Sequence, residues 1–243
     1  MSIRNKDIGT SNESSLHRTL KLQYTGPGGK TEVTAGEFLA DGITKDGEYI
    51  EVQTGSFAPL KKKVKEFASH GKVRIVYPVA VRKMLEFYKP VSVKKTKKQT
   101  GKKNVELLYR RKSPVKGSLW NIFDALIHAP ELPLIEGVSI EIVLIDIIEK
   151  RVRDGKGSWR RKGVSIKDRQ LTCRHESVLL EKPADYLRFI PFKKKEEFTS
   201  SLLAEKAGID KPAARKALYV LTKLKITKRT EKKGTAWIYV RKK

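Results

Sequence analysis

At 243 residues the chain is long enough to bury a substantial hydrophobic core, as one large domain or two smaller ones. It carries 53 lysines and arginines against 27 aspartates and glutamates, and these cations occur along its whole length. The formal net charge of +26 makes a polyanion the expected partner, because neutralising phosphates releases counterions. DNA is the leading candidate and RNA the second, although very basic ribosomal proteins show that charge alone indicates binding and not catalysis.

Membrane and secreted proteins are disfavoured by the same composition. No apolar run is long enough to span a bilayer, and the N-terminus lacks the apolar stretch of a signal peptide. No amphipathic basic helix with exposed aromatic residues suits a membrane surface. The single cysteine, Cys173, excludes an internal disulfide framework. We therefore expect a cytoplasmic, nucleoid-associated protein with no membrane partner.

The first third of the chain is predicted to alternate helices and strands. The expected elements are a helix over residues 13–23, a glycine-rich turn at 26–29, strands at 34–43 and 48–54, a helix over 59–69 and a strand at 73–81. Lys45, Asp46 and Gly47 supply turn chemistry, so the first two strands should form an antiparallel hairpin. This order predicts an α/β core with a mixed sheet.

The middle of the chain is more basic. Residues 89–116 are rich in lysine and arginine, which favours a solvated loop or an extended hairpin that follows a phosphate backbone. A helix over 119–128 and a strand at 138–148 should extend the first core. Residues 151–169 are predicted to form a glycine-rich basic loop that carries Trp159.

The last fifty residues are predicted to form a separate unit. A helix over 198–207, with Leu202 and Leu203 inward, precedes a turn at 208–210 and a second helix over 211–224. Asp210 caps that second helix and Pro212 stands in its first turn. A hairpin over 226–240 follows. Helix, turn, helix and hairpin is the order of a winged helix-turn-helix domain.

The predicted hairpin carries the residues that point to chemistry. Asp41 ends one strand, and Glu51 and Gln53 lie on the same face of the next. Two carboxylates on paired strands offer the oxygen ligands that hard divalent cations prefer, and the carbonyl of Val52 is a further candidate ligand. Glu13, on the helix expected beside these strands, could complete the metal shell or hold a water. Phosphodiester hydrolysis needs such a metal and a group that orients the attacking water.

These residues, followed by a lysine-rich helix and an apolar strand, resemble the core of the PD-(D/E)XK nuclease superfamily over residues 11–81. The resemblance implies a restriction-endonuclease-like fold in which Asp41 and Glu51 bind Mg²⁺ or Mn²⁺. Glu13 matches the helical glutamate of several branches. Ala40 replaces a loosely kept proline, and Gln53 stands where the superfamily usually has a catalytic lysine.

The missing lysine leaves alternatives open. Some branches work with glutamine, and in others the lysine moves to the next helix. The candidates there are Lys61, Lys62, Lys63 and Lys65. The structural alternatives are an ordinary hairpin for the strand residues, a surface or capping acid for Glu13, and a solvated helix face that touches phosphate for the lysines.

Nucleic-acid binding is predicted at two further places. The candidates on the second C-terminal helix and on the wing are Lys211, Arg215, Lys216, Lys223, Lys232 and Lys233. Arg215 is the first choice for a base edge, since arginine can donate two hydrogen bonds to guanine. Trp159, with Arg160 and Arg161 beside it, could stack on an unpaired base. The alternatives are backbone attraction alone, a dimerisation or protein-binding role for the C-terminal unit, and a tucked tryptophan.

The sequence thus predicts a nuclease domain over residues 1–190, with a basic loop at 89–116 and an α/β extension at 117–190, and a winged-helix domain over 191–243. The leading function is a metal-dependent endonuclease that hydrolyses DNA. The alternatives are a catalytically inactive nuclease-fold regulator or architectural protein, and a ribonuclease. A homodimer would allow both DNA strands to be cut.

Overall fold

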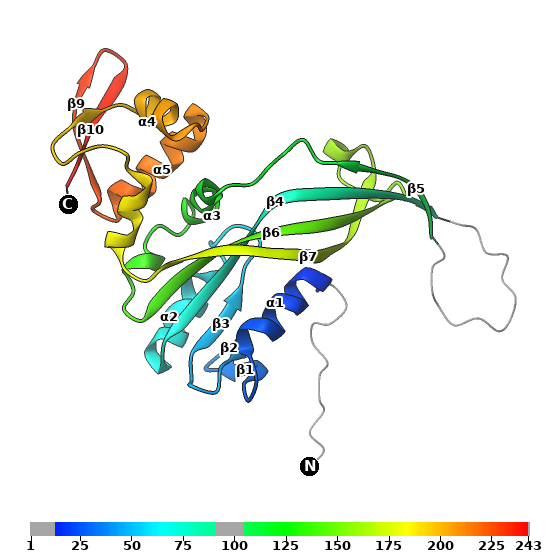
Figure 1. Ribbon diagram of the computed structural model, residues 1–243. Helices are drawn as coiled ribbons and strands as arrows, with labels where there is room; N and C mark the ends of the chain where they lie inside the picture. Colours follow the sequence, from blue (N-terminus) through cyan, green and yellow to red (C-terminus); the bar gives the residue numbers. More distant parts are fainter. Residues whose placement is uncertain (1–12, 91–104, 243) are drawn as a thin grey trace, which may run out of the picture. The chain divides into compact units, whose positions relative to one another are not determined.

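The computed structural model describes residues 13–90 and 105–242 (Figure 1). Its α-helices are α1 (Ser15–Thr25), α2 (Leu60–His70), α3 (Ile122–Leu126), α4 (Ser200–Ala207) and α5 (Lys211–Lys223). Short 3₁₀ helices are η1 (Leu119–Asn121), η2 (Leu132–Leu134), η3 (Trp159–Arg161) and η4 (Pro183–Phe189). Within the described ranges, no helix combines the length and the apolar character needed to cross a membrane.

The strands are β1 (Lys30–Ala35), β2 (Phe38–Ile43), β3 (Tyr49–Val52), β4 (Val73–Pro90), β5 (Val105–Lys112), β6 (Val138–Arg153), β7 (Val164–Leu180), β8 (Glu197–Phe198), β9 (Thr227–Lys233) and β10 (Ala236–Arg241). Seven of them form one sheet in the order β1-β2-β3-β4-β6-β7, with β5 paired to β4. The pair β3–β4 is parallel, whereas β1–β2, β2–β3 and β4–β5 are antiparallel. The predicted α/β class with a mixed sheet is confirmed.

The chain divides into two compact units, each built from three segments. The main unit consists of Lys21–Val79, Gly117–Leu144 and His175–Lys243. The strand unit consists of Met1–Leu20, Ala80–Lys116 and Ile145–Arg174. The predicted division at residue 190 remains a prediction, since the last segment of the main unit begins before it.

A tight turn divides the region that was predicted to be one strand at 34–43. Ala35 pairs with Phe38, and Gly36 between them has a φ of +57°. Such a backbone is readily adopted by glycine, so the chain reverses there and forms the β1–β2 hairpin. The predicted hairpin of the next two strands is confirmed, with Gly42 opposite Ile50.

Helix α2 forms the crossover between the parallel strands β3 and β4 and buries its apolar face. Leu60, Val64 and Phe67 are buried, as their spacing predicted. Phe67 stacks on Tyr49 of β3 with ring centroids 5.0 Å apart. Burying each such side chain contributes about 1.5–3 kcal/mol, so this face fixes the helix over the strands.

The long strands correct several predictions. Strands β4 and β6 continue beyond the predicted ends at 81 and 148, and β7 includes residues 164–169, the end of the region that was predicted to be a loop. The charged residues of these strands make them hard to predict from sequence. Buried Glu86 is paired, because it lies 2.9 Å from Arg110 across the β4–β5 pair. For residues 89–116 the hairpin alternative is correct where the structure describes them, and 91–104 lie outside the described residues.

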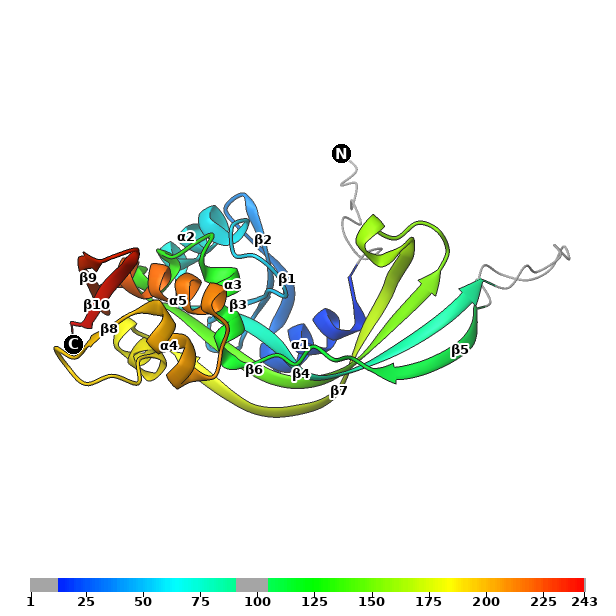
Figure 2. The ribbon, with the colours of Figure 1, turned by 90° about the horizontal axis from the view of Figure 1, so that it is seen from above.

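The C-terminal elements have the predicted order. Asp210 caps α5 by accepting a hydrogen bond of 2.7 Å from the Ala213 amide. The helices α4 and α5 lie beside the β9–β10 hairpin (Figures 1 and 2). This hairpin belongs to a three-stranded sheet of order β8-β10-β9. The predicted helix start at 198 is wrong, because Phe198 belongs to β8 and is buried. Leu203 points inward as predicted, whereas Leu202 is exposed.

Candidate metal centre and nucleic-acid surfaces

The β2–β3 hairpin brings the two predicted acids together. With Gly42 opposite Ile50, the antiparallel register places Asp41 opposite Glu51. The intervening turn is closed by the Thr44 amide donating to the Glu48 carbonyl at 2.9 Å. Asp41 is held in place by its own hydrogen bond, because its Oδ2 accepts from the Val52 amide at 2.8 Å.

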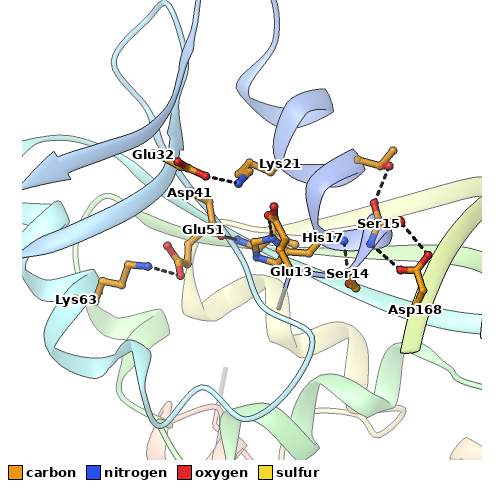
Figure 3. Close-up of polar contacts among 12 residues, drawn as sticks. Glu13, Ser14, Ser15, His17, Lys21, Glu32, Asp41, Glu51, Lys63 and Asp168 are labelled. Carbon is orange, nitrogen blue, oxygen red and sulfur yellow. Dashed lines mark hydrogen bonds and ion pairs between the residues drawn. The ribbon is translucent and has the colours of Figure 1, made fainter. Parts of the chain in front are cut away.

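Helix α1 approaches this hairpin at Gly42. A Cβ atom at this position would lie 2.0 Å from the Thr25 hydroxyl, so only glycine admits the helix end there. One turn earlier, the Nζ of Lys21 lies 3.1 Å from Glu32 of β1 (Figure 3), and the Lys21 side chain is buried. Lys21 was not predicted from the sequence, since a lysine on an amphipathic helix carries no sign that tertiary packing will bury it.

Glu51 is the most unusual acid of the hairpin. It is 5% exposed, and its Oε1 lies 2.6 Å from the Nζ of Lys63 on α2 (Figure 3). Its Oε2 is buried and has no hydrogen-bond partner among the residues that the structure describes. The pKa of Glu51 is raised to about 7, mainly by burial and also by the negative charge of Asp41, while Lys63 opposes both effects. A buried acid with one oxygen unsatisfied is costly, and such groups cluster at functional sites.

Of the four predicted lysines on α2, the structure brings Lys63 to Glu51. Lys61 instead pairs with Glu131 at 3.1 Å, while Lys62 and Lys65 are exposed. Gln53 lies at the end of β3, where its amide nitrogen donates to the carbonyl of Ser56 at 2.6 Å. That bond holds the side chain against its own loop. That Gln53 orients the attacking water stays a prediction.

Glu13 differs from its prediction in one respect. Helix α1 begins at Ser15, so Glu13 precedes the helix instead of lying on it. The helix starts there because Asp168 of β7 accepts hydrogen bonds from the amide and the hydroxyl of Ser15 at 2.9 and 2.8 Å. Glu13 contacts His17, four residues on, at 2.6 Å (Figure 3). Both belong to the strand unit, whereas Asp41 and Glu51 belong to the main unit, and the joint site predicted for Glu13 stays a prediction.

Helix α5 presents a basic stripe. Lys211, Arg215 and Lys223 are exposed at intervals of four or eight residues, with exposed Tyr219 between them. Tyr219 was absent from the residues predicted from sequence, although its spacing places it on the same face. Lys216 lies off the stripe and bonds Asp124 of α3 at 2.7 Å.

The β9–β10 hairpin adds aromatic and basic groups. Trp237 is flanked by the Arg229 guanidinium at 4.5 Å and the Nζ of Lys232 at 5.1 Å from its ring centroid. Lys233 pairs with Glu197 at 3.2 Å. Trp237 and Arg229 were absent from the predicted set because their pairing depends on the strand register.

The comparisons with known proteins assign no activity. The family described as "Domain of unknown function (DUF8091)" matches residues 14–181. That range contains the β2–β3 hairpin and α2 and excludes α4, α5 and the last hairpin. A protein of Treponema pallidum (strain Nichols), described as uncharacterized, is 31% identical over 164 residues, which are 68% of this chain and 60% of the relative. The chain thus spans about 60% of that relative's length, and no solved structure matches the chain significantly.

Proposed function

The chain belongs to the DUF8091 family, and we propose that it is a metal-dependent endonuclease that hydrolyses DNA phosphodiester bonds. The observation that carries this proposal is the buried, unsatisfied Oε2 of Glu51 beside Asp41 and Lys63. An acid is rarely kept in such an environment for stability alone, because a hydrophobic residue of similar volume would cost less.

The donor set fits a divalent cation. Asp41 and Glu51 carry two negative charges against the one positive charge of Lys63, so a cation would offset the remaining repulsion. Carboxylate oxygens are the ligands that Mg²⁺ and Mn²⁺ prefer, and the Val52 carbonyl is the proposed third ligand. When bound, such an ion polarises the phosphate and lowers the pKa of a coordinated water.

The chain's own residues would supply the rest of the site. The Val52 amide holds Asp41 in one orientation, so no side-chain ordering is needed when a ligand arrives. The Lys63 ammonium, which contacts Glu51, is proposed to offset the charge that develops on a phosphate, the task of the lysine that Gln53 replaces. Gln53 is proposed to orient the attacking water through its amide oxygen, since its nitrogen is bonded to Ser56.

DNA binding is proposed for the C-terminal elements, as a winged helix-turn-helix over residues 191–243. The order of α4, α5 and the β9–β10 hairpin supports it, as does the exposed stripe of Lys211, Arg215 and Lys223. Arg215 is proposed to contact a base edge, and the hairpin lysines Lys232 and Lys233 to contact the flanking backbone. We further propose a cytoplasmic, nucleoid-associated protein that cuts both strands as a homodimer.

One observation favours a second function, a DNA-binding regulator that has lost cleavage. Gln53 stands at the position of the usual lysine, and its amide nitrogen is already used by the loop. In that case Asp41 and Glu51 would be remnants of a site, and the buried charge of Glu51 would serve no reaction.

A cleavage assay separates these functions. Purified protein with Mg²⁺ or Mn²⁺ is offered duplex, single-stranded and branched DNA and, separately, RNA. We expect DNA to be cut, and we expect Asp41→Ala and Glu51→Ala to abolish cutting while DNA affinity is retained. Glu37→Gln, which neutralises an exposed acid just before β2, is the matched control and should cut normally.

The other outcomes assign the alternatives. A wild type that binds DNA and cuts none of these substrates with either metal would refute the nuclease and favour the regulator. Preferential cutting of RNA would favour the ribonuclease. A Gln53→Lys variant that cuts faster than wild type would show that the glutamine had reduced the rate without abolishing it.

A further inference from the structure

The connection between β6 and β7, residues 154–163, holds a tryptophan almost entirely in solvent. Trp159 on η3 is 84% exposed, more than any other large hydrophobic residue that the structure describes. Tryptophan gains more from burial than most side chains, so a fully displayed one forgoes a large contribution to stability. Four cations surround it in the sequence: Lys156, Arg160, Arg161 and Lys162.

Backbone hydrogen bonds hold this connection in one conformation. The Gly157 amide donates to the Gly163 carbonyl at 3.0 Å, which closes the turn. The amides of Arg161 and Lys162 donate to the carbonyls of Ser158 and Trp159, each at 2.9 Å. The tryptophan therefore stands on a closed turn. Because the backbone of this turn is already ordered, it need not be ordered when a partner binds.

Side chains brace the same turn from its base. Asp154 pairs with the Lys167 ammonium at 2.6 Å and accepts hydrogen bonds from the Ser165 hydroxyl and the Lys156 amide. Gly157 packs so closely on the following strand that a Cβ there would lie 1.9 Å from the carbonyl oxygen of Val164. These contacts hold the base of the turn against β7, and the tip of the turn carries the exposed Trp159 ring.

One face of the Trp159 ring is occupied and the other is accessible. The Arg160 guanidinium lies 5.5 Å from the ring centroid, a cation–π distance. Because the side chain is 84% exposed with Arg160 in place, the opposite face is open to a second flat group. The site thus offers one planar aromatic face in a positively charged setting.

We infer that this turn is a stacking platform for an unpaired base, so that the DNA recognised by this chain contains single-stranded nucleotides. Every base has a π face, and cations beside the platform attract the adjoining phosphates. Bases inside a duplex are already stacked on their neighbours and are not accessible to the ring. This inference rests on the proposed function in one respect: it names the form of DNA on which the proposed nuclease site acts.

An anionic membrane is the other partner that an exposed tryptophan among cations can suit. Membrane-surface segments bury an apolar face made of several residues. Between residues 154 and 163, Trp159 is the sole large apolar side chain, and its neighbours are Ser158 and Arg160. A single ring among polar groups favours stacking over insertion.

The test is a binding experiment that needs no cleavage. The full chain carrying Asp41→Asn, in EDTA, is titrated into a labelled short single strand and into the matched duplex, at two salt concentrations. We expect Trp159→Ala to weaken single-strand affinity about tenfold and duplex affinity less than about twofold. Trp159→Phe, which keeps a stacking ring, should stay within about threefold of the parent.

Two controls define the effect. Leu134→Ala removes another exposed apolar side chain, in the main unit, and should leave both affinities unchanged. Because stacking is not ionic, the Trp159→Ala defect should persist at the higher salt concentration. Arg160→Ala and Arg161→Ala should instead flatten the salt dependence of single-strand binding, by about 0.7 in log–log slope per lost phosphate contact.

Several outcomes would overturn the inference. Equal losses for single strand and duplex would make Trp159 part of a general DNA surface, and no loss would remove it from binding. Binding to phosphatidylserine vesicles that depends on Trp159, with single-strand affinity unchanged, would assign the turn to a membrane instead.

The inference and the nuclease proposal can fail separately. A tenfold single-strand defect in a protein that never cuts DNA would retain the stacking platform and refute the nuclease. Normal cutting of all DNA forms by Trp159→Ala, together with unchanged binding, would refute the platform and retain the nuclease.

Discussion

Replacing Glu51 with glutamine should stabilise the metal-free protein above neutral pH while removing its capacity to bind a divalent cation. The carboxyl is buried, and its pKa is raised from 4.5 to about 7 in the folded protein. An acid with a raised pKa holds more protons when folded than when unfolded, so the free energy of unfolding falls as pH rises from about 4.5 to 7. At 1.36 kcal/mol per pH unit, the ionised carboxylate costs roughly 3 kcal/mol above pH 7.

Glutamine has the same shape and no charge, so the Glu51→Gln variant should lack this cost. Its amide oxygen can still accept the hydrogen bond from Lys63, which limits what the substitution removes. The variant should therefore exceed wild type by less than about 1 kcal/mol at about pH 5 and by roughly 3 kcal/mol at about pH 8.5. For a chain of this size, that difference raises the Tm by roughly 6–12 °C.

Urea and thermal unfolding in EDTA, at both pH values, measure the effect. Mn²⁺ should then raise the Tm of wild type and leave that of Glu51→Gln unchanged, because an ion that binds the folded state stabilises it by mass action. Glu37→Gln should behave as wild type throughout. A Glu51→Gln variant that is less stable than wild type at about pH 8.5 would refute the reasoning, since Glu51 and Lys63 would then form a stabilising structural ion pair.

Three further predictions concern other residues. Lys63→Ala removes the charge that lowers the pKa of Glu51, so the midpoint of Mn²⁺ binding against pH, measured calorimetrically, should move upward; a downward shift would contradict the geometry. Arg215→Ala should weaken duplex binding by about 1–3 kcal/mol and relax the sequence preference at the contacted base, whereas Lys216→Ala should change binding less because that lysine is paired within the main unit. Gly157→Ala would force a Cβ into the backbone of the next strand and should cost about 1–3 kcal/mol in urea unfolding; full stability would show that the turn is not locked.

Local signals explain what could be predicted of the fold. The Asp46-Gly47 turn and the alternation of strand residues identified the β2–β3 hairpin, and Asp210 marked the start of α5. Strand β7 was missed because many of its side chains are polar. Some of these polar residues pair with residues of other strands, as when Arg169 pairs with buried Glu149 of β6 at 2.9 Å. Such partners exist only once the sheet has formed, so no local pattern reveals them.

The residues of the candidate site also differ in whether the sequence could predict them. Asp41 and Glu51 could be chosen from sequence because a hairpin register follows from the turn between its strands. Choosing Lys63 among four lysines required the rotation of α2 over β3, which tertiary packing decides. The raised pKa of Glu51 likewise depends on burial by residues distant in the sequence.

The hydrogen bonds between Ser15 and Asp168 have a consequence for how this protein is made. They join positions 153 residues apart, so the first turn of α1 obtains its cap from a residue synthesised much later. Each compact unit is also assembled from three separate stretches of chain. Contacts of such long sequence separation fold slowly, because the intervening loop must close before the contacts form. While the ribosome is still adding β7, the start of α1 has no cap from Asp168, and the nascent chain must remain soluble until that strand emerges.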